Sequence, residues 1–410
     1  MFENFKETAG GVCAPAGFRA NGVHCGIRKN KLKKDLALIA ADELCVTACA
    51  YTSNLVKGAP ILVTKKHVEN GYAQAVIVNS GNANTCNANG VEIAEGMCAL
   101  VQEHTGIERE NVVVASTGVI GQELSLEPIA GGMKELCAGL RADGEGSAAA
   151  AEAIMTTDTV KKETAITFGI AGKTCTIGAV AKGVGMICPN MATMLLFVTT
   201  DVNISPEMLR RALAANVKDT VNMLSVDGDT STNDTLCIMA NGRAGNTLID
   251  KAGVDYRIFK DALGTVLRKL CRMLARDGEG ATKLIECRVY NAKKVTDARL
   301  AAKSVVKSNL VKAAIFGSDI NWGRVLCALG YAGADLDISK IDVTFRSRAG
   351  ELLVCKGGYG VAFSEEEAKK LLSEDEIEIA VNLNAGVYEA TAYGCDLTYD
   401  YVKINGDYRT

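Results

Sequence analysis

The stretch from Lys182 to Leu195, KGVGMICPNMATML, holds residue types that could form a nucleophile without histidine. Its glycines follow a predicted strand, and Ala192-Thr193 leads directly into the apolar run MLLFV. The hydroxyl of Thr193 could attack the carbonyl carbon of Ala192 and convert the peptide to an ester, whose hydrolysis would free the threonine amine. The residues alone also allow a plain loop that re-enters a sheet, with Thr193 as the first residue of a strand.

A freed N-terminal threonine would carry its own base. The pKa of an α-amino group is about 8, so part of the population is neutral near physiological pH and can accept the proton of the hydroxyl. The β-branched side chain has few rotamers, which helps to aim the oxygen. This chemistry suits a chain whose three histidines, His24, His67 and His104, are isolated and lie in no nucleophile-elbow context.

Two glycine motifs that bind nucleotides are incomplete in this chain. Gly172-Lys173-Thr174 resembles the end of a P-loop, but Thr167 stands where that loop needs its first glycine. Gly183 and Gly185 are followed by Cys188 where a dinucleotide-binding loop needs its third glycine. We therefore expect neither loop here.

The composition is that of an ordinary soluble protein. Of 410 residues, 48% are hydrophobic and 23% are charged, and the net charge of -3 gives no basic excess for nucleic acid or an anionic membrane. The 15 cysteines are scattered without a CxxC pair, so we expect reduced, buried thiols and no metal site. The N-terminus shows no leader and no apolar run reaches about 18 residues, which predicts a cytoplasmic protein.

Strand-like and helix-like segments alternate along the chain, which predicts a mixed α and β fold of layered sheets covered by helices. Before the midpoint we expect strands over 73–84 and 111–121 with a helix over 91–106 between them. Ser205-Pro206 is a good helix start, and 255–278 has one apolar face. After a soft boundary near 285–295, a hairpin around Arg348-Ala349-Gly350 opens a region of strands.

The stretch KGVGMICPNMATML resembles the self-cleavage segment of the glutamate N-acetyltransferase family, also called ornithine acetyltransferase, which acts in arginine biosynthesis. Further segments similar to that family follow one another along almost the whole chain. They are GVCAPAGFRANGVHCGIRK (11–29), NSGNAN (79–84), ASTGVIGQ (115–122), SVDGDTSTNDT (225–235), DGEGATKLIE (277–286) and SNLVKAAIFGSDINWGR (308–324). The chain departs from the family pattern at the loop TCNANG and at Cys13, Cys25 and Cys188.

The resemblance implies a fold and an assembly. A layered α/β/β/α domain over 1–288 would carry the threonine nucleophile, and a smaller α/β domain over 289–410 would return its tail to the active site. Cleavage between Ala192 and Thr193 would yield an α chain, 1–192, and a β chain from 193. Two α and two β chains would form a heterotetramer.

The resemblance also implies residue roles. Thr193 would be the nucleophile and, through its α-amine, the base, and Thr117 and Gly118 would form the oxyanion hole. A strand end followed by glycine suits that role, because a hydroxyl and a backbone N–H can converge there. The amino-acid substrate would be bound by Thr156, Lys182, Thr193, Glu279, Asn405 and Thr410. By residue type alone, Thr117 could equally cap a turn, Glu279 could be a solvated acid, and Asn405 and Thr410 could be a frayed tail.

The expected reaction is acetyl transfer from N2-acetyl-L-ornithine to L-glutamate by a ping-pong mechanism. Acetyl-CoA would be a second acetyl donor, which would make N-acetylglutamate directly, and no cofactor would be tightly bound. Two alternatives remain at this point. One is a self-processing threonine amidase or aminopeptidase, in which water accepts the acyl group. The other is a non-catalytic amino-acid-binding regulator whose chain stays intact.

Overall fold

The computed structural model describes residues 5–188 and 194–407, and the chain divides into two compact units. The first contains Met1–Gly183, Asn190–Val217 and Thr230–Leu270, and the second contains Val184–Pro189, Lys218–Asp229 and Cys271–Thr410. The division at Leu270 comes earlier than the expected boundary after residue 288. Residues 284–288 belong to the second unit because the strand over 284–292 pairs with two strands of that unit.

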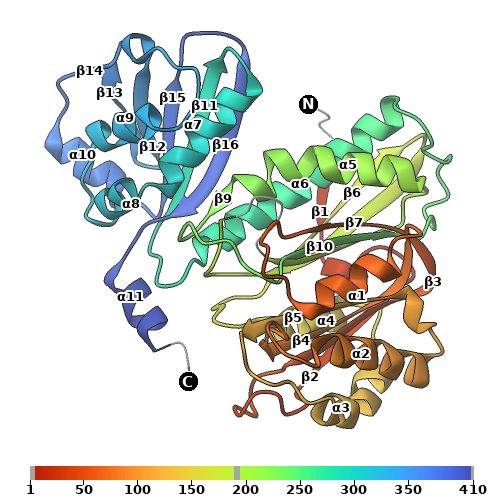
Figure 1. Cartoon of the computed structure of the whole chain (residues 1–410). Coiled ribbons are helices and arrows are strands. Elements are labelled where there is room, and N and C mark those ends of the chain that lie inside the picture. Colours follow the sequence, from red (N-terminus) through yellow and green to blue (C-terminus); the bar gives the residue numbers. More distant parts are fainter. Residues whose placement is uncertain (1–4, 189–193, 408–410) are drawn as a thin grey trace. The chain divides into compact units, whose positions relative to one another are not determined.

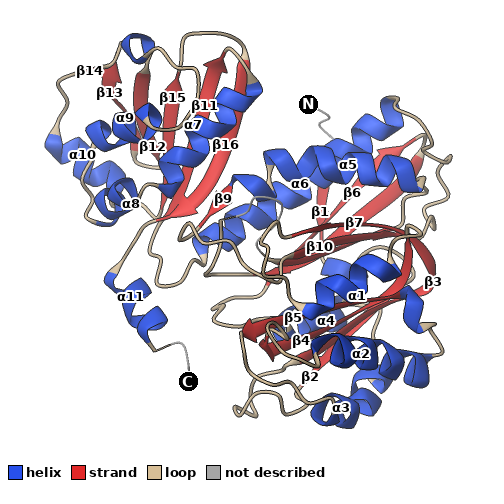
Figure 2. Ribbon diagram, viewed as in Figure 1, coloured by secondary structure: helices blue, strands red, loops and turns tan. Residues whose placement is uncertain are grey.

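Strands far apart in sequence form the sheet of the first unit (Figure 2). In the described part of the chain its order is β1 (Lys6–Thr8), β6 (Lys162–Ile170), β7 (Lys173–Lys182), β8 (Leu195–Thr200), β10 (Thr235–Ala240), β3 (Leu36–Tyr51), β4 (Tyr72–Asn82) and β5 (Val112–Val119), with β2 (Phe18–Val23) on β3. The 16-residue strand β3 pairs with β4 through its first half and with β10 through its second half. It therefore joins the two halves of the sheet.

Alternation along these strands builds a layered core, because successive side chains point to opposite faces. One cluster packs residues of β3, β4 and β5 with residues of β7, β8 and β10, among them Ile39, Val113, Phe197 and Cys237. The opposite row, which includes Leu38, Ile77 and Val114, packs against α2 (Gly90–Thr105) and α3 (Glu127–Ala138). The expected layered α/β class is confirmed.

Four more helices begin in the first unit, and Figure 1 shows α5 and α6 lying beside β6, β7 and β10. They are α1 (Ala59–His67), α4 (Gly144–Ala153), α5 (Pro206–Asp219) and α6 (Val254–Arg276). The predicted start of α5 is confirmed, since the Ser205 hydroxyl accepts a hydrogen bond from the Met208 N–H at 3.3 Å. The predicted end of α2 is confirmed as well, because Gly106 adopts φ 76°.

The second unit is a seven-stranded sheet, in the part that the structure describes, with its main helices packed on one face. The strand order is β14 (Tyr359–Gly360), β13 (Gly350–Lys356), β12 (Asp342–Ser347), β15 (Glu376–Asn382), β11 (Leu284–Ala292), β16 (Tyr388–Cys395) and β9 (Leu224–Ser225). The helices are α7 (Val295–Lys307), α8 (Asn309–Phe316), α9 (Trp322–Gly330), α10 (Glu365–Leu372) and α11 (Tyr399–Gly406). The predicted hairpin is confirmed, because Ser347 pairs with Gly350.

The cysteine side chains fit the expectation from composition. All 15 cysteines are free and most of them are buried, and burial raises the pKa of thiols such as Cys45 to about 12. Across residues 5–188 and 194–407, helices that combine the length and the apolar character needed to cross a membrane are absent.

Candidate active site

The end of β5 carries the predicted oxyanion pair. Thr117 and Gly118 lie opposite Ser80 and Gly81 of β4, and both are partly exposed. Gly118 has φ 132°, and a Cβ built on it would lie 2.3 Å from the carbonyl carbon of Gly81. A side chain at this position would therefore force β4 and β5 apart, which explains the glycine.

Lys182, the last residue of β7, contacts Thr117 near the end of β5. Its Nζ donates a hydrogen bond to the Thr117 Oγ1 at 3.2 Å, and the residue is 8% exposed. Lys182 also pairs with Leu195, the first residue of β8, and Leu195 pairs with Thr235 of β10. The strand that follows the predicted nucleophile thus begins beside Lys182. Ala192 and Thr193 themselves lie outside the described residues, as does Thr410.

A buried carboxylate ties Thr156 to the end of β7. Asp158 Oδ1 accepts hydrogen bonds from Lys162 Nζ at 2.7 Å and from the Gly183 N–H at 2.9 Å. Its Oδ2 accepts from the Thr156 N–H at 2.9 Å. Burial alone would raise the pKa of Asp158, but the charges of Lys182 and Lys162 and these hydrogen bonds lower it to about 2. The ionised carboxylate therefore fixes Thr156 and the Lys182-Gly183 peptide in one place.

We expect Asp158→Asn to lower the free energy of unfolding by about 3–5 kcal/mol at neutral pH, because Lys162 would stay buried without this charge. The depressed pKa means that the stabilising charge is complete above the ordinary carboxyl range and is lost as pH falls toward 2. The difference between wild type and variant should therefore shrink from pH 4 downward in urea unfolding curves. The control, Asp335→Asn in an exposed pair with Lys293, should cost about 1 kcal/mol or less. Equal losses in the two variants would contradict the assignment.

Asn233 and Asp234 lie in the loop before β10, and Asn233 bonds to residues at the ends of β4 and β5. Asn233 Nδ2 donates to the carbonyl oxygens of Ala83 at 2.5 Å and Ser116 at 3.0 Å, so it fixes the residue that precedes Thr117. Asp234 is fully buried, and burial raises its pKa well above the usual range even though Ser231 and Lys182 oppose the shift. The Asp234 carboxyl group, which precedes the residue that pairs with Leu195, therefore holds its proton more strongly than an exposed aspartate does.

Two of the predicted substrate residues come together in the second unit. Asn405 Nδ2, on α11, donates to Glu279 Oε2 at 2.8 Å. Glu279 is 8% exposed, and its backbone N–H donates to the carbonyl oxygen of Val184 at 2.8 Å. Glu279 is thus a buried and positioned acid, and the interpretation as a solvated turn residue is wrong.

The sequence analysis did not identify several residues that hold Thr156, Lys182 and Thr117 in place. Asp158, Lys162 and Asn233 were not singled out, although Asp158 lies in a polar run, TTDTVKK, between an alanine-rich helix and a strand. The motif SVDGDTSTNDT contains Asn233 and Asp234 but indicates no pairing partner by itself. An acidic residue among small polar residues, followed four positions later by a lysine, is the signal that the sequence offers for Asp158.

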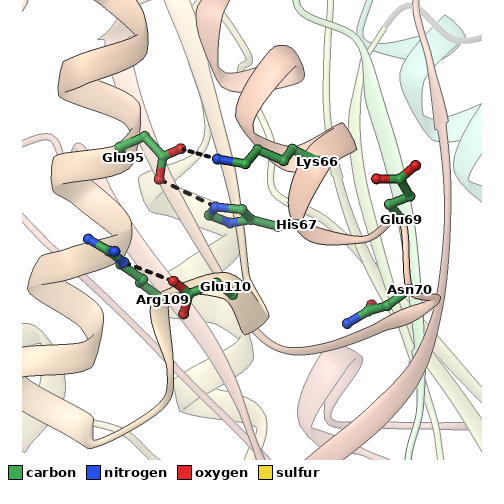
Figure 3. A pocket seen from close by; sticks show the side chains of 7 residues that line it. All are labelled: Lys66, His67, Glu69, Asn70, Glu95, Arg109 and Glu110. Atoms are coloured by element: carbon green, nitrogen blue, oxygen red, sulfur yellow. Dashed lines mark hydrogen bonds and ion pairs between the residues drawn. The ribbon is translucent and has the colours of Figure 1, made fainter.

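A cavity elsewhere in the first unit contains none of these groups (Figure 3). It has a volume of about 630 Å³ and is lined by Lys66, His67, Glu69, Asn70, Glu95, Arg109 and Glu110. Most of its charged groups pair with each other: Glu95 faces both Lys66 and His67, and Arg109 bonds to Glu110. The cavity offers no hydroxyl or thiol nucleophile, so it is not the candidate active site. Among the described residues, no group of three or more His, Cys, Asp or Glu side chains is arranged to hold a metal ion.

The chain has the layered fold of the α/β sandwich class. Its strand ends carry the hydroxyl of Thr117, the ammonium group of Lys182 and the backbone of Gly118, which are the kinds of group that an enzyme uses. The ArgJ family model matches residues 19–410, and the chain belongs to this family. The predicted resemblance is confirmed.

Curated relatives cover nearly the whole chain. A Symbiobacterium thermophilum protein named "Arginine biosynthesis bifunctional protein ArgJ" is 52% identical over 404 residues, which are 98% of this chain and 99% of the relative. A Clostridium acetobutylicum protein, "Arginine biosynthesis bifunctional protein ArgJ 1", is 50% identical over 394 residues, 96% of each chain. Among solved structures, the ornithine acetyltransferase of Mycobacterium tuberculosis complexed with ornithine is 35% identical, with a TM-score of 0.42. The matched region covers 46% of this chain and 100% of the Mycobacterium tuberculosis chain in that structure.

Proposed function

We propose that the protein transfers an acetyl group from N2-acetyl-L-ornithine to L-glutamate through an ester on Thr193, after cleaving itself between Ala192 and Thr193. The observation that carries the proposal is the hydrogen bond from Lys182 to Thr117 beside the first residue of β8. It supports the proposal because an oriented hydroxyl and a cation lie near the start of β8, which begins two residues after Thr193 in the sequence.

Each step has a group suited to it. The α-amine of Thr193 takes the hydroxyl proton as the oxygen attacks the acetyl carbonyl. The Thr117 hydroxyl accepts from Lys182, which leaves its own proton free to point at the developing oxyanion, and the Gly118 N–H is the second donor. The α-ammonium of Thr193 then returns the proton that it took to the nitrogen of ornithine, so that collapse of the tetrahedral intermediate expels ornithine as a neutral amine and leaves the acetyl ester. The amine of glutamate attacks that ester by the reverse sequence and takes the acetyl group.

The substrate contacts follow from charge. Thr156 and Lys182, which Asp158 holds together, suit a carboxylate, and Glu279 with Asn405 suits an ammonium group. We assign Thr410 to substrate binding on the resemblance alone. The word "bifunctional" in the relatives' names supports acetyl-CoA as a second donor to the same threonine. No tightly bound cofactor, a cytoplasmic location and an assembly of two α and two β chains belong to this proposal.

Incubation with N2-acetylornithine alone should add one acetyl group to the chain that begins at Thr193, because the donor reacts before the acceptor binds. Intact mass measurement of both chains checks this, with glutamate alone as the control, and initial rates should give parallel double-reciprocal lines. Intersecting lines with no acetylated chain would contradict the ping-pong mechanism. Rapid acetate release without glutamate would favour the hydrolase alternative, and a single intact chain on a denaturing gel would favour the regulator.

A further inference from the structure

The segment Val184–Ile187 has an unusual backbone conformation just before the predicted cleavage site. Met186 has φ 54°, in the left-handed region that residues with a side chain rarely adopt. Such a conformation costs about 1 kcal/mol or more and persists only where neighbouring groups hold it. Ile187 precedes the Ala192-Thr193 bond by five residues. The position of this segment therefore limits where the following chain can run.

Asp227 holds the segment through its backbone. The Met186 N–H donates to Asp227 Oδ2 at 2.5 Å, and the Ile187 N–H donates to Oδ1 at 2.9 Å. The Val226 N–H returns a hydrogen bond to the Ile187 carbonyl oxygen at 2.7 Å. Hydrogen bonds to an ionised carboxylate are shorter and stronger than neutral ones. Asp227 thus compensates for the strain at Met186.

Glu279 contacts the same segment at Val184 and Gly185. Its N–H bonds to the Val184 carbonyl oxygen, and a Cβ built on Gly185 would lie 2.3 Å from its Oε2. A side chain at 185 would therefore have to displace the Glu279 carboxylate from the position in which it accepts from Asn405.

Helix α11 contacts both acids from one of its faces. The Tyr401 hydroxyl donates to Asp227 Oδ2 at 3.3 Å, and Asn405, one turn later, donates to Glu279 at 2.8 Å. Burial and the charges of Asp227 and Glu279 raise the pKa of Tyr401, so its phenol remains a donor. The C-terminal helix is thereby connected to the segment before the cleavage site through two carboxylates.

We propose that Asp227 and Tyr401 are positioning residues for self-cleavage, which hold Val184–Ile187 so that the chain beyond it reaches the cleavage-competent arrangement. This inference rests on the self-cleavage in the proposed function. Neither side chain is assigned a contact with the acetyl donor or acceptor.

Asp227→Asn should slow cleavage about tenfold or more, because the amide keeps one acceptor and turns a donor toward an N–H or O–H group. The rate falls with the fraction of chains that hold the competent arrangement. Tyr401→Phe should slow cleavage less, by about two- to fivefold, since it removes one long hydrogen bond. Asp229→Asn is the matched control, because it removes the same charge from the same turn. In the described structure the Asp229 side chain makes no hydrogen bond or ion pair with Val184–Ile187, so this variant should cleave at the wild-type rate.

The measurement is a time course of full-length chains made by cell-free synthesis and separated on a denaturing gel. A core variant of the same unit, Val343→Ala, with a comparable loss of Tm, controls for stability and should cleave normally. Slow cleavage in Asp227→Asn and normal cleavage in both controls would support the proposal. Wild-type kinetics in Asp227→Asn, or equal slowing in Val343→Ala, would overturn it while leaving self-cleavage intact. A wild-type chain that stays uncut would overturn both.

Discussion

Thr193→Ala is expected to leave one uncleaved chain that transfers no acetyl group. Alanine has no hydroxyl to attack the Ala192 carbonyl, so neither the ester nor the free α-amine can form. Nucleophile and base would be lost together, and we expect acetyl transfer to fall by about 10⁶-fold, as when a nucleophile is removed from other covalent enzymes. A denaturing gel and intact mass report cleavage, and formation of N-acetylglutamate reports transfer.

The matched control is Thr193→Ser, which keeps a hydroxyl and loses a methyl group. Serine should still cleave and transfer, more slowly, because its side chain samples more rotamers. Two chains cut at the same bond in the alanine variant would show that another group breaks the peptide. In that case the threonine would be an ordinary strand-initial residue.

Elements with strong periodicity and clear end signals could be predicted from the sequence. The strand, helix and strand over 73–121 are one example, because an apolar run, an amphipathic stretch and Gly106 each indicate one structure. Strand β3 was harder to predict, since Asp42 and Glu43 interrupt its apolar pattern. The structure places these two acids at a register shift with β4, where they bond to Arg243 and, for Asp42, also to Arg19.

The candidate site could be predicted in part, and the limit has a physical cause. The glycine at 118 follows from the resemblance, whereas its reason, the 2.3 Å approach to Gly81, depends on the register of β4 and β5. Asp158 accepts from the Gly183 N–H, which the folding of β6 and β7 brings back to it across 25 positions of sequence. Asp227 likewise meets Met186 across 41 positions of sequence. Contacts of this kind depend on tertiary structure and leave no local pattern.

Thr117→Ala should reduce acetyl transfer by about 10²-fold or more with a modest change in KM. The oxyanion carries full negative charge only in the tetrahedral intermediate, so a donor aimed at it stabilises the transition state far more than the bound substrate. In this chain the donor is oriented by Lys182, whose Nζ donates to the Thr117 Oγ1 at 3.2 Å.

That hydrogen bond adds a second test, because it couples the effects of substitutions at Lys182 and Thr117. If Lys182 acts partly through Thr117, Lys182→Met and Thr117→Ala should be less than additive in the double variant, because each removes the same oriented hydroxyl. The Lys182 variant alone should also raise KM, since its ammonium is assigned to a substrate carboxylate. Thr117→Ser restores the hydroxyl and should keep most of the activity. If the alanine variant, folded and fully cleaved, turned over at the wild-type rate, Thr117 would be a turn-capping residue, and the oxyanion donors would have to be sought among other backbone N–H groups near the start of β8.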